Sequence, residues 1–86
     1  HIPLIGYQRP GSPKVAEQVA QLANSVRGVM LERLGPVVWE SSVSRASYAL
    51  EELEETARLW LMSDPKPEPL DQAALDELRE TFGATW

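Results

Sequence analysis

The sequence predicts an α/β fold built from three helices and two or three short strands. Three segments repeat apolar residues at helical spacing, and each begins at a serine or aspartate that suits a helix N-terminus. Two short runs of β-branched and aromatic residues lie between the first and second of these segments, as expected for neighbouring strands. Because a sheet usually has about four to six strands, we expect further strands to come from residues before His1 or from another chain.

The first part of the chain is a short apolar stretch followed by a helix. Residues 2–7 contain Pro3, which restricts them to an edge strand or an extended lead-in. Ser12 and Pro13 predict an N-cap and a first helical residue, and hence a helix over 13–24. The apolar positions of this segment are Val15, Val19, Leu22 and Val26.

Two strands joined by a turn are predicted next. The runs 29–31 and 37–39 are too short for helices, and turn-forming residues bound them. The segment Leu34-Gly35-Pro36 between them is predicted to form the turn. Binding and catalytic residues are often found on loops held by a rigid scaffold, so this turn is the first place to look for a site.

The longest helix is predicted to begin at a cap formed by Ser42 or Ser44 and to end near Met62. One face of this helix is apolar and is expected to be buried. Its members are Ala46, Leu50, Leu53, Ala57 and Leu61. The opposite face carries Arg45, Glu51, Glu52, Glu55 and Arg58.

The acidic side of this helix allows two interpretations. Glu51, Glu54 and Glu55 lie near one another on a helix, which is the arrangement of a metal or acid–base site. No Glu-x-x-His motif accompanies them, as carboxylate-bridged metal bundles require. We therefore favour a solvated face on which Arg58 pairs with Glu54 or Glu55.

A proline-rich connector over 65–70 separates the main part of the chain, 1–64, from a C-terminal helix and tail, 71–86. Proline at every second position excludes a helix in the connector and favours an extended chain. Asp71 is predicted to cap the last helix and Gly83 to end it.

The buried face of the last helix is predicted from its apolar spacing. Leu70, just before the cap, is placed to pack on Leu75 as a hydrophobic staple. The residues expected on the buried face are Ala74, Leu75, Leu78 and Phe82.

The composition excludes several classes of partner. The net charge of -5 and the sequence pI near 4.7 repel nucleic-acid phosphates. The absence of cysteine excludes disulfides and thiolate metal sites, and no apolar run is long enough to cross a membrane. We expect a soluble, cytoplasmic protein. Because the chain is short and begins at His1 without an initiator methionine, we expect it to be a fragment with a marginal core.

Few single residues predict chemistry by themselves. His1 is the only histidine, and one imidazole cannot form a three-ligand zinc site or a catalytic triad. The sequence contains neither of the glycine-rich phosphate-binding motifs. Three tryptophans, Trp39, Trp60 and Trp86, are expected to pack in the core or at an interface rather than to line a ligand pocket.

Three segments together resemble the C-terminal half of class II aldolases. They are residues 2–12, residues 29–39 with the Gly-Pro-Val-Val-Trp string, and residues 51–57 with the sequence Glu-Glu-Leu-Glu-Glu-Thr-Ala. The order and spacing match over nearly the whole chain, and the chain is identified as a member of the class II aldolase and adducin family. Within that family it is most similar to the 3-oxo-tetronate 4-phosphate decarboxylase branch.

The resemblance implies a fold, an activity and a metal. It implies that the chain is the C-terminal part of a three-layer α/β/α sandwich that assembles as a homo-oligomer, usually a tetramer, with the active site at a subunit interface. It also implies a lyase acting on a small sugar phosphate, with zinc or another divalent cation held by three histidines beside a glutamate.

The ligands of that metal are not found in this chain. Two histidines and the glutamate belong to a part of the family sequence that would precede His1, and Leu34 occupies the position of the third histidine. Leucine has no lone pair for a cation, so we expect no cofactor or metal bound by this chain alone. Glu32 is the one carboxylate near enough to be considered as a substitute ligand.

Two hypotheses follow. The first is that the chain is a segment of a metal-dependent sugar-phosphate lyase and is inactive by itself. The alternative is a non-catalytic, adducin-like assembly or binding module in which the fold has outlived the chemistry.

Overall fold

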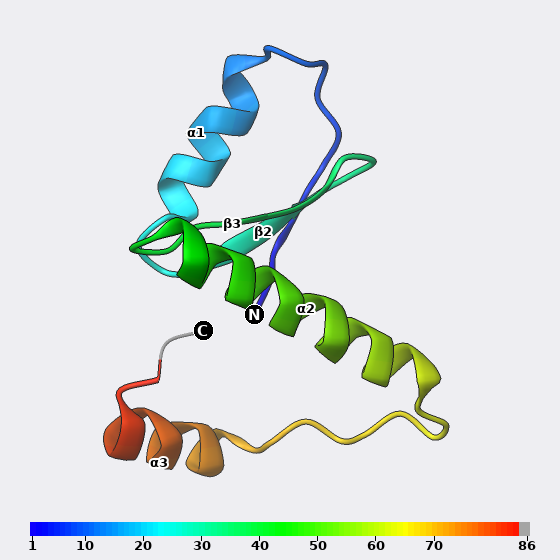
Figure 1. Cartoon of the computed structure of the whole chain (residues 1–86), viewed down its shortest axis with the longest axis vertical. Helices are drawn as coiled ribbons and strands as arrows, with labels where there is room; N and C mark the ends of the chain where they lie inside the picture. The colour runs from blue at the N-terminus through cyan, green and yellow to red at the C-terminus, as the bar shows by residue number, and fades with distance from the viewer. Residues whose placement is uncertain (85–86) are drawn as a thin grey trace.

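The computed structural model of the chain describes residues 1–84, and Trp86 lies outside this range. Helices and strands follow in the order β1 (Leu4–Ile5), α1 (Pro13–Leu22), β2 (Gly28–Leu31), β3 (Gly35–Val38), α2 (Val43–Met62) and α3 (Gln72–Phe82), as Figure 1 shows. The α/β class and the three helices are as predicted. The apolar lead-in contributes a two-residue edge strand, so the strands number three.

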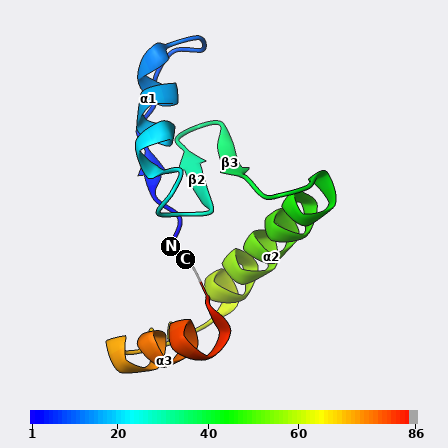
Figure 2. The same cartoon turned by 90° about the vertical axis from the view of Figure 1, so that its left-hand side faces the viewer.

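The three strands form one mixed sheet in the order β1-β2-β3. Strand β1 runs parallel to β2, with Leu4 opposite Met30, whereas β3 runs antiparallel to β2, with Val29 opposite Val37. The sheet lies between α1 and α2 in both Figure 1 and Figure 2. The described residues therefore have a helix on either side of a narrow sheet, which is a partial layered α/β arrangement.

The turn between β2 and β3 lies two residues earlier than predicted. It spans residues 32–34, and Gly35 and Pro36 already belong to β3. The amide of Trp39 donates to the carbonyl of Arg27 at 3.2 Å. Because backbone groups alternate along a strand, the amides of the odd-numbered residues of β3 point toward β2 and those of the even-numbered residues point away from it. Pro36 then faces the outer edge, where no N–H is needed.

The outer edge of β1 is open within the described residues. The amides of Met30 and Glu32 donate to the carbonyls of Pro3 and Ile5 at 2.8 and 2.9 Å. Consecutive backbone groups of a strand point in opposite directions. The amide and carbonyl of Leu4 therefore point away from β2, and no described residue bonds them.

Each helix begins where its capping residue was predicted. The side chains of Ser12, Ser42 and Asp71 accept hydrogen bonds from amides of the first turn at 3.4, 3.2 and 2.9 Å. The cap of α2 is thus Ser42 rather than Ser44. Gly83 ends α3 in the left-handed conformation at φ 62°, as predicted.

The connector begins with a set of contacts, here called the Lys66 clasp, in which Lys66 bonds the end of α2. The ammonium of Lys66 donates to the carbonyls of Trp60 and Leu61 at 2.6 and 3.1 Å. It also lies 4.4 Å from the centre of the Trp60 ring. Two of the four carbonyls left without a helical partner in the last turn of α2 are thereby satisfied.

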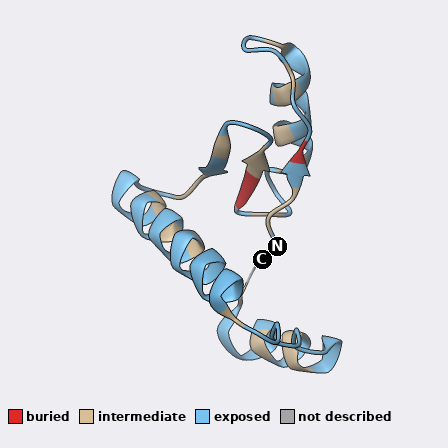
Figure 3. Cartoon of the chain, turned by 90° about the vertical axis from the view of Figure 1, so that its right-hand side faces the viewer, coloured by how far each residue is buried: buried red, intermediate tan, exposed pale blue. Residues whose placement is uncertain are grey.

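The predicted buried faces of the helices are only partly covered, with Val15, Val19, Leu22, Ala74, Leu75 and Leu78 half-buried. Ile5 and Val29 are the only buried apolar residues described, and both belong to the sheet (Figure 3). Leu61 is 72% exposed and Phe82 is 76% exposed, although both were expected to be buried. Helical spacing correctly locates these apolar faces, but within residues 1–84 no residue of the three helices is fully buried.

Candidate functional site

The β2–β3 turn is held at the end of β1 by two hydrogen bonds. The carboxylate of Glu32 accepts the amide of Tyr7 at 2.7 Å, and the amide of Glu32 donates to the carbonyl of Ile5 at 2.9 Å. The amide of Leu34 donates to the carbonyl of Leu31 at 3.1 Å, which closes the turn. Leu34 is 67% exposed, so the residue that the sequence analysis singled out in this turn projects into solvent.

The side chains around this turn do not fit a zinc ion. Leu34 offers no lone pair, and the carboxylate of Glu32 already bonds the Tyr7 amide. Within residues 1–84, no group of three histidine, cysteine, aspartate or glutamate side chains is arranged to hold a metal. Structural and catalytic zinc sites need three or four such ligands, which the described residues do not bring together.

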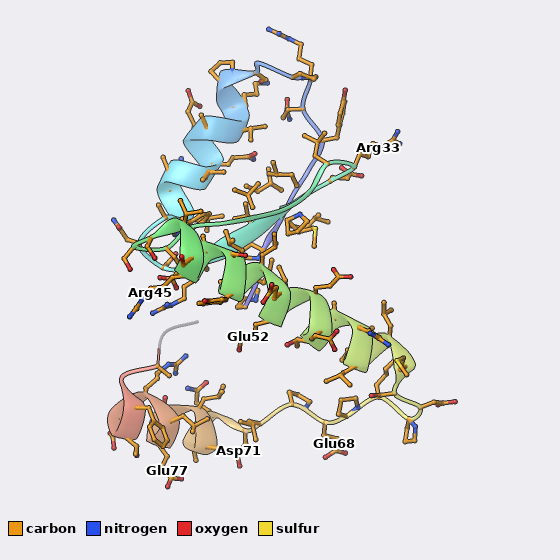
Figure 4. All side chains as sticks on the ribbon, in the orientation of Figure 1. Arg33, Arg45, Glu52, Glu68, Asp71 and Glu77 are labelled. Carbon is orange, nitrogen blue, oxygen red and sulfur yellow. The ribbon has the colours of Figure 1, made fainter. Side chains whose placement is uncertain are left out.

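The turn brings together two side chains that sequence inspection missed. Arg33 has a φ of 67°, and its guanidinium carbon lies 5.9 Å from the centre of the Tyr7 ring. Figure 4 shows Arg33 at the tip of the hairpin. The two residues are 26 positions apart in sequence, and only the parallel pairing of β1 with β2 places them side by side. No local pattern signals this contact.

A cavity of about 440 Å³ lies at the opposite end of the hairpin from Leu34. Its walls come from the start of β2, the end of β3, the side of α2 and both ends of the described chain. Its lining residues are His1, Ile2, Arg27, Val38, Glu40, Ala49, Glu52, Leu53, Thr56 and Ala84. Arg27 and Glu40 form an ion pair at 2.6 Å across the strands, which makes their first role structural.

The acidic face of α2 is exposed to solvent. Glu51, Glu54 and Glu55 line a shallow hollow with Leu50, and Arg58 pairs with Glu55 at 3.5 Å. The exposure of all these side chains agrees with the predicted solvated face. Figure 4 shows Glu52 on the same helix.

The two described tryptophans have structural contacts. The indole of Trp39 donates to the carbonyl of Ala23 at 3.3 Å, which ties the end of β3 to the end of α1. Trp60 supports Lys66, as described above, and is 52% exposed. Neither lines the cavity.

Comparison with known proteins gives consistent matches. The sequence profile of the Class II Aldolase and Adducin N-terminal domain matches residues 1–61. A 3-oxo-tetronate 4-phosphate decarboxylase from Cupriavidus necator is 63% identical over an alignment that covers 100% of this chain and 42% of the relative. A protein of the same name from Escherichia coli K12 is 38% identical, over 92% of this chain and 38% of the relative.

A solved structure agrees with these matches. The crystal structure of YgbL from Escherichia coli, for which aldolase, epimerase or decarboxylase activity has been suggested, superposes with a TM-score of 0.78. Its sequence identity is 38%, and the match covers 92% of this chain and 39% of YgbL. The chain thus spans about two fifths of the length of the relatives it matches.

No helix within residues 1–84 combines the length and the apolar character that a membrane span requires.

The profile match covers most of the chain, and the first relative matches along all of it. The chain therefore belongs to the class II aldolase and adducin family, most closely to its 3-oxo-tetronate 4-phosphate decarboxylase branch.

Proposed function

We propose that this chain is a segment of a metal-dependent sugar-phosphate lyase, an aldolase or decarboxylase of a tetronate or pentulose phosphate. The observation that carries the proposal is the 63% identity to a relative named 3-oxo-tetronate 4-phosphate decarboxylase, together with the aldolase-like fold. In this proposal the complete protein is a cytoplasmic homo-oligomer, such as a tetramer, with its active site between subunits.

The chain alone is proposed to be inactive. Its one histidine, His1, lies beside the cavity at the far end of the hairpin from Leu34. The remaining metal ligands and the substrate-binding residues would have to come from sequence outside these 86 residues. The main contribution of the chain to a lyase is then its sheet edge, its helices and the turn that carries Leu34.

The proposal is tested by making the longer polypeptide that contains this chain, with Leu34 and with the substitution Leu34→His. Zinc is measured by mass spectrometry and carbon dioxide release is measured with 3-oxo-tetronate 4-phosphate. We expect Leu34→His to raise the zinc content to about one ion per subunit, because an imidazole supplies the metal ligand that leucine lacks. The substitution should change the free energy of unfolding by no more than about 0.5 kcal/mol, because the turn position is exposed.

The outcomes separate the two hypotheses. Turnover by either protein supports the lyase. If both proteins fold but bind no zinc and release no carbon dioxide, the lyase proposal is wrong and the adducin-like binding module is favoured. A Leu59→His variant controls for zinc that binds any added surface histidine, because Leu59 is 63% exposed and lies on α2.

A further inference from the structure

Arg33 occupies a backbone conformation that arginine disfavours. It is the only residue other than glycine with a positive φ within residues 1–84. Contact between Cβ and the backbone makes this region unfavourable for L-residues, and glycine or asparagine is the usual choice there. A strained residue that persists at an exposed turn is a reason to look for a role of its side chain.

The guanidinium of Arg33 is held over an aromatic ring. Its central carbon is 5.9 Å from the centre of the Tyr7 ring, within the range of a cation–π contact. Tyr7 is in turn fixed by the bond from its amide to the Glu32 carboxylate at 2.7 Å. Tyr7 is 51% exposed, so the contact with the guanidinium lies at the surface and is open to solvent.

No carboxylate neutralises this guanidinium among the described residues. The ion pairs found there join Arg27, Arg58 and Arg79 to acidic side chains. The nearest acidic residue in sequence, Glu32, directs one carboxylate oxygen to the Tyr7 amide. Arg33 therefore has no ion-pair partner among the described residues, and its guanidinium is available to a ligand.

We propose that Arg33, supported by Tyr7, is an oxyanion-binding residue at the tip of the β2–β3 hairpin. The planar guanidinium fork matches a carboxylate or a phosphate with two parallel hydrogen bonds. The ligand class, a small sugar acid or its phosphate, rests on the proposed function. Because Leu34 follows directly, the bound oxyanion would lie next to the position of the family histidine.

The test is a titration of the 86-residue chain with sodium phosphate and, separately, with sodium threonate at constant ionic strength. Amide shifts of Tyr7, Arg33 and Leu34 are followed by NMR, with sodium chloride as the baseline. The variant Arg33→Gly removes the guanidinium and relieves the positive φ, so its fold is retained. Tyr7→Leu removes only the aromatic support, and Arg45→Gln removes an exposed arginine elsewhere.

We expect saturable shifts confined to the hairpin tip. Arg33→Gly should weaken binding at least about fivefold, Tyr7→Leu about twofold, and Arg45→Gln should leave it unchanged. The anion with the smaller Kd identifies the group that is recognised. Shifts equal to those with chloride, or affinity unchanged in Arg33→Gly, would overturn the proposal.

Two further points keep the result decisive. If the chain does not fold alone, the same titration is made on the chain fused to the remaining portion of the Cupriavidus necator relative, with the same two outcomes. Binding is read without turnover, so loss of lyase activity with intact anion binding contradicts the proposed function and not this inference.

Discussion

Gly28 lies where the sheet leaves no room for a side chain. A Cβ added there would lie 2.8 Å from the carbonyl oxygen of Val37 and 3.0 Å from a methyl carbon of Val38. The first atom belongs to the backbone of the neighbouring strand and the second to a β-branched side chain, so neither moves aside easily. The absence of a side chain at Gly28 therefore sets the close approach of β3 to β2.

We expect Gly28→Ala to lower the free energy of unfolding by about 1–3 kcal/mol, because the strand backbone must move to admit the methyl group. Urea denaturation followed by circular dichroism measures this change. Gly6→Ala is the matched control, since its Cβ would meet only a side-chain oxygen of Glu32 at 3.9 Å. Equal stability of the two variants would show that the strands are not packed as described.

At the same scale, the turn residues show where sequence reasoning is sufficient and where it is not. The two strands, the turn between them and the position of Leu34 next to Gly35 follow from local patterns of β-branched residues, glycine and proline. The φ of Arg33 and its contact with Tyr7 do not, because arginine has no preference for that conformation and the contact joins residues far apart in sequence. The turn was placed two residues late because proline was assumed to lie outside the strand.

Among the elements, the C-terminal end of α2 is stabilised by a side chain that lies just beyond the helix. The ammonium of Lys66 bonds two carbonyls of its last turn and stacks on Trp60. A positive charge at a helix C-terminus also interacts favourably with the helix dipole. Lys66 thus couples the order of the last turn of α2 to the direction of the connector.

We expect Lys66→Met to cost about 0.5–1 kcal/mol and to speed hydrogen exchange at the amides of Met62 and Ser63. Lys14→Met is the control, because Lys14 is also exposed but lies in the first turn of α1. Unchanged exchange at Met62 and Ser63 in Lys66→Met would mean that the clasp does not order the end of α2.

The ends of the helices could be predicted from sequence more fully than the burial of their faces. Ser12, Asp71 and Gly83 could be assigned from sequence because a cap is a local arrangement of a side chain or a glycine with the backbone next to it. Burial of Leu61 or Phe82 depends on what lies opposite, which a pattern within one helix cannot specify. The periodicity therefore predicted which residues share a face but not how fully that face is covered.

For the whole molecule, the exposed area is large for the mass. The chain exposes 7041 Å², whereas a compact monomer of 9.6 kDa exposes roughly 5,100 Å². The radius of gyration is 14.7 Å, against about 12 Å for a compact domain of this length. The excess of roughly 2,000 Å² is comparable with the area buried in an obligate protein interface.

We expect the free energy of unfolding of the isolated chain to lie below the ~5 kcal/mol that is the usual lower limit for domains. Only two apolar side chains, Ile5 and Val29, are buried among the described residues, so the hydrophobic contribution to folding is small. Urea denaturation should give a shallow transition at low denaturant. A steep, cooperative transition with a larger free energy would contradict this expectation.

The open outer edge of β1 has a consequence for handling the protein in solution. Unbonded strand edges are templates for pairing with another chain, and at neutral pH the net charge of -5 opposes such pairing by repulsion. As the pH falls toward the sequence pI near 4.7, carboxylates take up protons and the repulsion disappears. Light scattering should therefore rise between pH 7 and pH 5, and less so for Leu4→Lys, which places a positive charge on that edge and keeps strands of other molecules from docking there.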